Sequence, residues 1–327
     1  MELFRTVVNC AVSPEKTGYD TPILMMGSCF TENLGALMKR LKFDIVINPF
    51  GTVYHPAPLA YSVVRIISGK PYTNDDLCHY NEIWHSVDHH GRFSHTDASV
   101  CISMINNELL KARKQLARSR WLFLTFGSAW AYRLKNNGHY VANCHKLPAS
   151  DFERFRFEID QICETWNETI EALRFFNPHV KIVFTVSPIR HLRDGAHENQ
   201  LSKATLLLAI EKLTRKHTNT SYFPAYEIVL DELRDYRFFD ENMTHPSDAA
   251  INYIWRRFCE TYMDDDAMKI MKSVESIVKA ASHNPMHQTS EHRKFVENYL
   301  EKIAELKRQI PILDFRRETE QFELLLN

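Results

Sequence analysis

Five short apolar runs separate long amphipathic stretches along this chain, and this alternation constrains the fold more than any other feature. Continuous apolar runs of four to eight residues are typical of strands buried on both faces, as in parallel sheets. They span residues 23–26, 43–48, 121–126, 181–186 and, more weakly, 222–229. Helical spacing fills the stretches between them, over residues 31–41, 58–67, 99–116, 150–176, 199–217 and 247–262. The pattern predicts a doubly wound α/β fold with a mostly parallel sheet of about five strands.

The sequence changes character after residue 263. Charged, leucine-spaced segments at 264–281 and 291–310 follow, and we expect no further strand there. We therefore predict an α/β domain over residues 1–263 and a helical C-terminal extension over 264–327 that packs on it. A stretch without a predicted strand, residues 70–98, forms the main insertion in the first domain.

Composition narrows the functional class. The 327 residues are 44% hydrophobic and 25% charged, enough for a sizeable core. Lys and Arg number 40 against 41 Asp and Glu, so the chain as a whole attracts neither nucleic acid nor an anionic membrane. The seven cysteines form no C-x-x-C pair, and no apolar run reaches the roughly 18 residues of a membrane span. We expect a cytoplasmic protein with reduced thiols; the oligomeric state is left open.

The residues that follow the predicted strands matter most for function, because ligands of open α/β sheets bind at the carboxyl ends of the strands. Chemically useful side chains occur at four of these five ends. The segments are Gly27-Ser28-Cys29, Pro49-Phe50-Gly51, Gly127-Ser128, Ser187-Pro188-Ile189-Arg190 and Asn242-Met243-Thr244-His245.

The first of these segments places a serine beside a cysteine where a strand turns into a helix. Gly27 allows the sharp turn, and the helix N-terminus favours negative charge that develops beside it. His245 also stands at a strand end before a helix, and it could take the proton of a nucleophile. The alternative roles are a helix cap for Ser28 and a small buried hydrophobe for Cys29.

Two further groups of residues suggest a ligand. The insertion holds Asp88 and a cluster of histidines, namely His79, His85, His89, His90 and His95. Their spacing matches no known zinc pattern, so we favour a substrate-shaping loop over a metal-dependent hydrolase and predict no cofactor. Arg190, Arg193 and Lys146 could bind an anionic substrate group, or they could be surface cations.

Several longer sequence words resemble the GSCFA family, a bacterial group placed within the SGNH/GDSL-like hydrolases. The words include GSCFTENLG, INPFGTVYHP, LTFGSAWAY, VANCHK, TVSPIRHLRDG and THPSDAA, and the resemblance covers most of the chain. It implies a flavodoxin-like three-layer α/β/α fold. It also implies an esterase or acyltransferase that acts on a small-molecule or carbohydrate ester.

The resemblance also implies roles for individual residues. Ser28 would be the nucleophile, Gly51 an oxyanion-hole N–H and His245 the general base. The other substrate-binding positions expected at this site are Asn143, Gly127, Arg190 and His145.

Two positions depart from the family pattern. Ala129 stands where a side-chain oxyanion donor is expected, with Asn143 as the nearest substitute. Asn242 stands three residues before His245, where the pattern has an aspartate, so Asp240 or Glu241 would have to supply the acid.

Two alternatives to a serine hydrolase follow from these departures. Laying GSCF on GDSL letter for letter places the nucleophile at Cys29, and a Cys29–His245–Asn242 set would suit thiol chemistry. The other alternative is a binding module that has kept the pocket and lost turnover.

Overall fold

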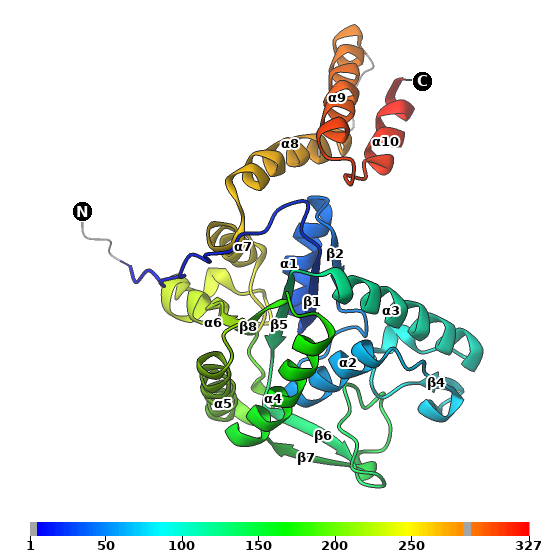
Figure 1. The fold of residues 1–327 in the computed structure, drawn as a ribbon, viewed down its shortest axis with the longest axis vertical. Helices are drawn as coiled ribbons and strands as arrows, with labels where there is room; N and C mark the ends of the chain where they lie inside the picture. The colour runs from blue at the N-terminus through cyan, green and yellow to red at the C-terminus, as the bar shows by residue number, and fades with distance from the viewer. Residues whose placement is uncertain (1–4, 284–288, 327) are drawn as a thin grey trace.

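The computed structural model describes residues 5–283 and 289–326 and is built around a five-stranded parallel sheet (Figure 1). The strands are β1 (Ile23–Gly27), β2 (Ile45–Ile47), β5 (Trp121–Phe126), β8 (Lys181–Val186) and β9 (Thr220–Tyr222). Their order is β2-β1-β5-β8-β9, and each neighbouring pair is parallel. Counted along the chain this is the 2-1-3-4-5 order of flavodoxin-like folds. The predicted fold class is confirmed.

Helices cover both faces of the sheet, because successive side chains of each strand point to opposite sides. In β1, Ile23 and Met25 pack with α1 (Cys29–Arg40) and α7 (Asp248–Tyr262). Leu24 and Met26 face the other layer. That layer comprises α2 (Pro56–Ser68), α3 (Ala98–Arg118), α4 (Ile159–Phe176) and α5 (Gly195–Lys216). Burial on both sides explains why the strands appear in the sequence as continuous apolar runs.

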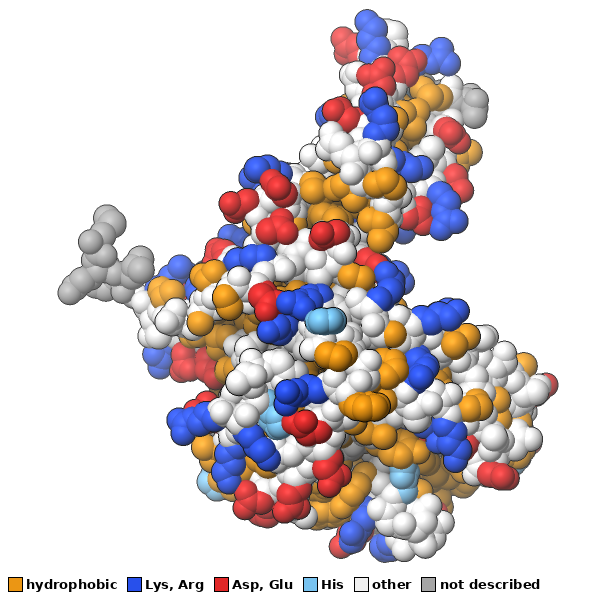
Figure 2. Space-filling view, in the orientation of Figure 1, with side chains coloured by type: hydrophobic (Ala, Val, Ile, Leu, Met, Phe, Trp, Pro, Cys, Tyr) orange, Lys and Arg blue, Asp and Glu red, His pale blue; other side chains and the backbone are white. Residues whose placement is uncertain are grey.

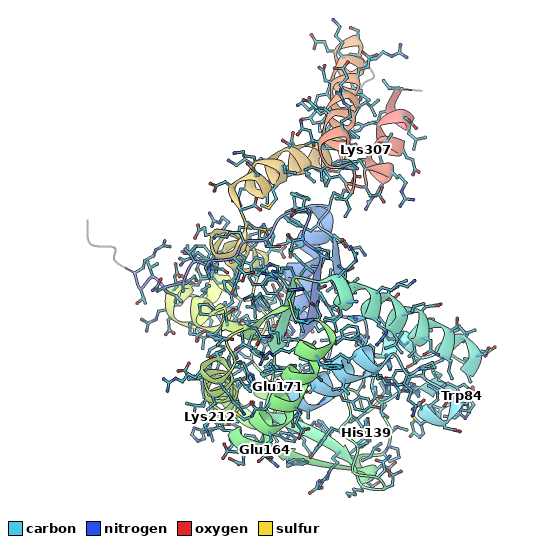
Figure 3. All side chains as sticks on the ribbon, viewed as in Figure 1. Trp84, His139, Glu164, Glu171, Lys212 and Lys307 are labelled. Carbon is cyan, nitrogen blue, oxygen red and sulfur yellow. The ribbon has the colours of Figure 1, made fainter. Side chains whose placement is uncertain are left out.

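The outer surfaces carry the charge. Glu164 and Glu171 of α4 and Lys212 of α5 are exposed on the solvent side of their helices (Figure 3). Figure 2 shows basic and acidic side chains interspersed over this view of the molecule. The mixture agrees with the formal net charge of −1.

Two small antiparallel sheets accompany the main one, and the sequence analysis predicted neither. The insertion contains a hairpin of β3 (Cys78–Tyr80) and β4 (Ile83–His85), which corrects the expectation that it holds no strand. The second sheet pairs β6 (Trp130–Leu134) with β7 (Phe152–Arg156). Because β7 occupies the start of the predicted helix 150–176, α4 begins only at Ile159. Short 3₁₀ turns complete this region and others, at Asn74–Asp76, Gly91–Phe93, Ala149–Asp151, Leu192–Asp194 and Tyr236–Phe238.

The predicted strand 222–229 is wrong over most of its length. The strand β9 ends at Tyr222, and a short helix α6 (Ala225–Glu227) and a π-helical segment (Ile228–Leu233) follow. Pro224 precedes α6 and has no N–H to continue a strand ladder. The apolar residues of this segment are buried as a helix face against α7, so their burial alone did not distinguish helix from strand.

Three helices form the C-terminal part, α8 (Asp265–Ala281), α9 (Ser290–Gln309) and α10 (Arg316–Leu326), and the described residues there include no strand. In Figure 1 they lead away from the sheet, with α9 and α10 side by side. Lys42, after α1, forms an ion pair with Glu318 of α10 at 2.7 Å, which ties the two parts together. The boundary at residue 264 stays a prediction. No helix in the two described ranges is long and apolar enough to cross a membrane.

Candidate active site

A cavity of about 500 Å³ lies at the carboxyl edge of the sheet, beside the start of α1. The strand order reverses at β1, which is where flavodoxin-like folds bind ligands. Segments that follow β1, β2, β5 and β8 all contribute to its wall. The lining residues are Ser28, Cys29, Thr52, Tyr54, His55, Pro58, His90, Trp130, Tyr132, Val141, Ala142, Asn143, Cys144, Ile189, Arg190, His191 and His245.

Ser28 is the N-cap residue of α1 and is only 3% exposed. Its Oγ accepts a hydrogen bond from the N–H of Phe30 at 3.2 Å and donates none within the described residues. The hydroxyl proton is therefore free to pass to a base. The same position that makes Ser28 a helix cap also places its oxygen beside the positive end of the helix dipole.

Gly27 sets the turn that presents this serine. Its φ is +141°, and a Cβ at this position would lie 2.4 Å from the carbonyl oxygen of Thr125 in the neighbouring strand. Its N–H donates to Oδ1 of Asn48 at 2.8 Å. Only glycine fits this backbone position, so the turn before Ser28 is closely specified.

His245 reaches the same cavity from a loop that precedes α7. Its Nδ1 lies 3.3 Å from Oδ1 of Asn242 and 3.1 Å from Oγ1 of Thr244. The Asn242 oxygen also accepts from the N–H groups of Thr244 and His245, at 2.9 and 3.0 Å. An amide oxygen held as an acceptor favours the tautomer with the proton on Nδ1. Nε2, which has no partner among the described residues, is then left as the basic nitrogen.

Asp240 lies close to His245 only through its backbone. Its N–H donates to the carbonyl oxygen of His245 at 2.8 Å, whereas its carboxylate has no hydrogen bond to the imidazole. Asn242, and not Asp240, occupies the orienting position.

Gly51 does not fit its predicted oxyanion role. Its N–H donates to the carbonyl oxygen of Asn48 at 2.7 Å, and the residue does not line the cavity. The glycine is needed for another reason, because its φ is +79° and a Cβ would lie 2.1 Å from that of His90. The next residue, Thr52, does line the cavity, and its N–H has no acceptor among the described residues. The N–H of Cys29, the first residue of α1, likewise has no intrahelical acceptor.

The remaining predicted binding residues divide into two groups. Asn143 lines the cavity; its Oδ1 accepts from the N–H of His145, which leaves the Nδ2 donor free. His145 does not line the cavity, because its Nε2 contacts the carbonyl oxygen of Ser86 at 2.7 Å and its ring stacks on His85. Gly127 also lies behind the wall, with its carbonyl oxygen bound by Lys203. Both residues shape the site from outside.

Cys29 lines the cavity next to Ser28. The residue is exposed as a whole, yet desolvation of its thiol and the nearby Glu32 carboxylate raise its pKa. A raised pKa disfavours the thiolate, which is the reactive form of cysteine.

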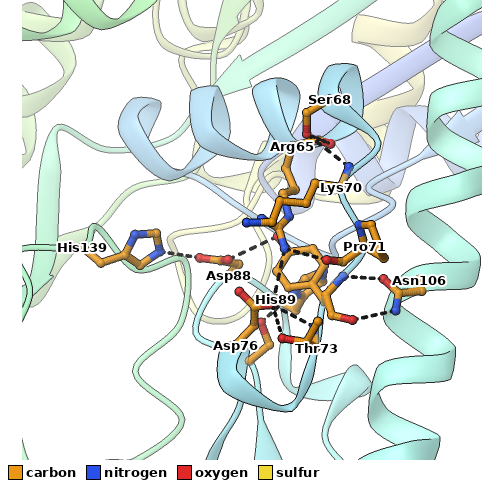
Figure 4. Close-up of polar contacts among 12 residues, drawn as sticks. Arg65, Ser68, Lys70, Pro71, Thr73, Asp76, Asp88, His89, Asn106 and His139 are labelled. Atoms are coloured by element: carbon orange, nitrogen blue, oxygen red, sulfur yellow. Dashed lines mark hydrogen bonds and ion pairs between the residues drawn. The ribbon is translucent and has the colours of Figure 1, made fainter.

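Within the insertion, His89 and Asp88 make structural contacts. His89 is fully buried, its Nδ1 pairs with Oγ of Ser86 at 2.8 Å, and burial lowers its pKa to about 3. Asp88 accepts from Tyr72 and from Nε2 of His139, at 3.2 and 2.6 Å, and the second contact raises the pKa of His139 (Figure 4). Nowhere in the described ranges do three or more His, Cys, Asp or Glu side chains gather so as to hold a metal ion. The metal-site alternative therefore has no ligand set there.

Sequence reasoning missed Lys203, a lysine of α5 that is 1% exposed. Its Nζ donates to the carbonyl oxygens of Gly127 and Ser187, at 2.6 and 2.7 Å, and so joins the ends of β5 and β8. Burial, together with the charge of Arg190, lowers its pKa to about 7. The spacing of Lys203 in the sequence indicates that it is buried, because it shares a helix face with Leu206 and Ile210.

Comparisons with known proteins give distant structural similarities. A carbohydrate esterase family 3 protein from Talaromyces cellulolyticus is 9% identical, with 78% of this chain and 99% of that chain covered and a TM-score of 0.36. An acetyl xylan esterase from the rumen bacterium Butyrivibrio proteoclasticus is 11% identical, with 74% and 63% covered and a TM-score of 0.38. At this level of similarity neither structure bears on the chemistry of the cavity. No curated protein sequence matches this chain.

Two family profiles match the sequence of this chain. The profile of the GSCFA family matches residues 22–258, which include every residue that lines the cavity. The profile of the GSCFA domain protein C-terminal domain matches residues 274–327. The chain therefore belongs to the GSCFA family.

Proposed function

We propose that this protein hydrolyses an ester or acyl bond, with Ser28 as nucleophile and His245 as general base. One observation carries the proposal. Ser28 and His245 lie 217 positions apart in the sequence and line one cavity, where the serine proton and the imidazole Nε2 both lack a partner in the described structure. A small-molecule or carbohydrate ester is the substrate class that the family resemblance favours.

The chemistry follows from this pairing. Nε2 of His245 removes the proton as Oγ of Ser28 attacks the ester carbonyl carbon, and the imidazolium then gives the proton to the departing alcohol oxygen. Water, activated by the same nitrogen, hydrolyses the acyl-serine to a carboxylate. If a sugar hydroxyl takes the place of that water, the same residues carry out acyl transfer.

Negative charge on the carbonyl oxygen needs donors at the start of α1. The unpaired N–H groups of Cys29 and Thr52 and the free Nδ2 of Asn143 all belong to the cavity wall, and we assign the oxyanion to this set. Asn143 would thus take the place of the side-chain donor that Ala129 lacks.

The weak point of the site is the neutral Asn242. It orients the imidazole but gives no charge to stabilise the imidazolium that forms in the transition state. This observation favours a second candidate, a binding module with little or no turnover. The thiol alternative, Cys29 with His245 and Asn242, is disfavoured by the raised pKa of Cys29.

Turnover of short-chain p-nitrophenyl esters tests the proposal. We expect the Ser28→Ala and His245→Ala proteins to lose at least about 100-fold in kcat/KM, and Cys29→Ala to keep most of it. Loss with Cys29→Ala and not with Ser28→Ala would transfer the nucleophile to the thiol. Circular dichroism and a thermal unfolding curve for each variant separate chemistry from misfolding.

A further inference from the structure

The described cavity lining contains a basic side chain and no aspartate or glutamate. Arg190 lines it together with His55, His90, His191 and His245. Burial lowers the pKa of His55 to about 3 and that of His191 to about 4, so these two rings are neutral near pH 7 and the permanent positive charge comes from Arg190. A pocket for a neutral ester needs no arginine, because the oxyanion is already bound by N–H donors, so Arg190 calls for a separate explanation.

Arg190 has no counter-ion among the described residues. Its side chain makes no ion pair and no hydrogen bond within the described residues, and its Nε is buried without a partner. Other partly buried arginines are paired: Arg154 with Asp194, Arg257 with Glu232 and Arg65 with Asp76. A guanidinium kept in a cavity wall without a carboxylate is available to a ligand.

The charge of Arg190 also acts on a second basic side chain, that of Lys203. Lys203 is buried; its Nζ donates to two carbonyl oxygens and lies 5.8 Å from the ring centre of Tyr226. The two positive charges disfavour each other, since the charge of Arg190 contributes to the lowered pKa of Lys203. Since no described carboxylate pairs with either side chain, an anion in the cavity would relieve the repulsion.

The position of Arg190 places such an anion next to the reacting groups. The backbone N–H of Arg190 donates to the carbonyl oxygen of Thr244 at 2.9 Å, and Oγ1 of Thr244 contacts Nδ1 of His245. The adjacent His191 has a buried Nε2 without a partner, and burial lowers its pKa to about 4, so its neutral ring can still donate one N–H. Guanidinium and imidazole N–H groups together match the oxygens of a carboxylate or phosphate.

We infer that the substrate of this cavity is an anionic ester, whose carboxylate or phosphate group is bound by Arg190. The inference rests on the proposed function in so far as it calls the substrate an ester. Binding of an anion by Arg190 does not depend on turnover.

Binding without catalysis is the first test. Inorganic phosphate, D-glucuronate and uncharged D-glucose are titrated calorimetrically into the wild type, Arg190→Gln and Arg215→Gln. Arg215 is an exposed arginine of α5 paired with Glu211, so its variant controls for the loss of one charge. We expect phosphate or glucuronate to bind more tightly than glucose, and Arg190→Gln alone to weaken that binding about 10- to 100-fold. Whichever of phosphate and glucuronate binds more tightly identifies the anionic group of the substrate as a phosphate or a carboxylate.

Turnover supplies the second test. The ratio of kcat/KM for mono-p-nitrophenyl adipate to that for p-nitrophenyl hexanoate compares a charged and a neutral acyl chain of equal length. Arg190→Gln should lower this ratio at least about tenfold, and Arg215→Gln should not.

The outcomes separate the two proposals. Arg190-dependent anion binding in a protein that hydrolyses no ester would support the anion site and contradict the hydrolase. Ester turnover with an unchanged ratio, and with anion binding that is absent or independent of Arg190, would support the hydrolase and overturn the anion site.

Discussion

Replacing Asn242 with aspartate should raise the activity of this protein. The Asn242 oxygen already lies 3.3 Å from Nδ1 of His245 and accepts from two backbone N–H groups, which suit a carboxylate oxygen equally well. The variant therefore adds one negative charge beside the imidazole and changes little else. If His245 is the general base, that charge stabilises the imidazolium that forms in the transition state.

The size of the effect follows from the distance. Two unit charges 3.3 Å apart attract by about 1.3 kcal/mol in bulk water and about 5 kcal/mol at an effective dielectric constant of 20. Because Asn242 is exposed, the lower part of this range applies, and about 1.5 to 3 kcal/mol is a reasonable expectation. Since 1.4 kcal/mol is a factor of ten in rate, kcat should rise about 10- to 100-fold.

The assay is kcat and kcat/KM for a p-nitrophenyl ester between pH 5 and 9, for the wild type, Asn242→Asp and Asn242→Ala. The pH at which activity falls on the acidic side should move upward in Asn242→Asp, since the imidazole would then keep its proton to a higher pH. Asn242→Ala should lose activity because Nδ1 loses its acceptor. A well-folded Asn242→Asp protein with unchanged or lower kcat, and an unshifted acidic limb, would refute the assignment of His245 and Asn242.

Three further predictions concern the neighbouring residues. Gly27→Ala should lower the free energy of unfolding by at least about 2 kcal/mol in urea titrations, because its φ is +141° and a Cβ would meet Thr125; Gly91→Ala, which meets nothing within 4 Å, is the control and should be nearly neutral. Asp240→Asn should change kcat by less than about tenfold, since its carboxylate has no hydrogen bond to His245; a loss of 100-fold or more would restore Asp240 as the acid. Lys203 has a pKa of about 7 in the folded state, against 10.5 for a free side chain. Between these two pH values the unfolded chain binds more protons than the folded chain. The contribution of Lys203 to the free energy of unfolding therefore rises with pH in this range. The free energy of unfolding of Lys203→Met should therefore rise less than that of the wild type from pH 7 to 10. If the two free energies change in parallel with pH, the lowered pKa of the buried lysine is contradicted.

The sheet was the part of the fold that the sequence predicted best. The strands 121–126 and 181–186 were predicted to the residue, because strands covered on both faces have apolar side chains at most positions. The segment 222–229 shows the limit of the same reasoning, since Pro224 and a π-helical turn follow a strand of only three residues. The β6–β7 hairpin was missed because its strands are half-exposed and rich in arginine and aromatic residues.

Prediction of the site was uneven for similar reasons. Ser28, Cys29, Asn143, Arg190 and His245 all line the cavity, and each follows a strand end or belongs to a recognisable sequence word. Gly51 was misassigned because a glycine after a strand gives no indication whether its N–H is free or is used in the turn, as it is here with Asn48.

The sequence by itself determined the alternation of strands and helices, and with it the edge of the sheet where the cavity lined by Ser28 and His245 lies. Apolar periodicity is a property of neighbouring residues, so it is visible without the packing. Only the tertiary structure decided which hydrogen-bond donors already have an acceptor and which charged side chains already have a counter-ion. Asp240 makes its hydrogen bond to His245 through its backbone N–H, Arg190 has no counter-ion among the described residues, and Lys203 is buried. Hydrogen-bond partners and burial depend on residues far apart in the chain, so they appear only when the packing is complete.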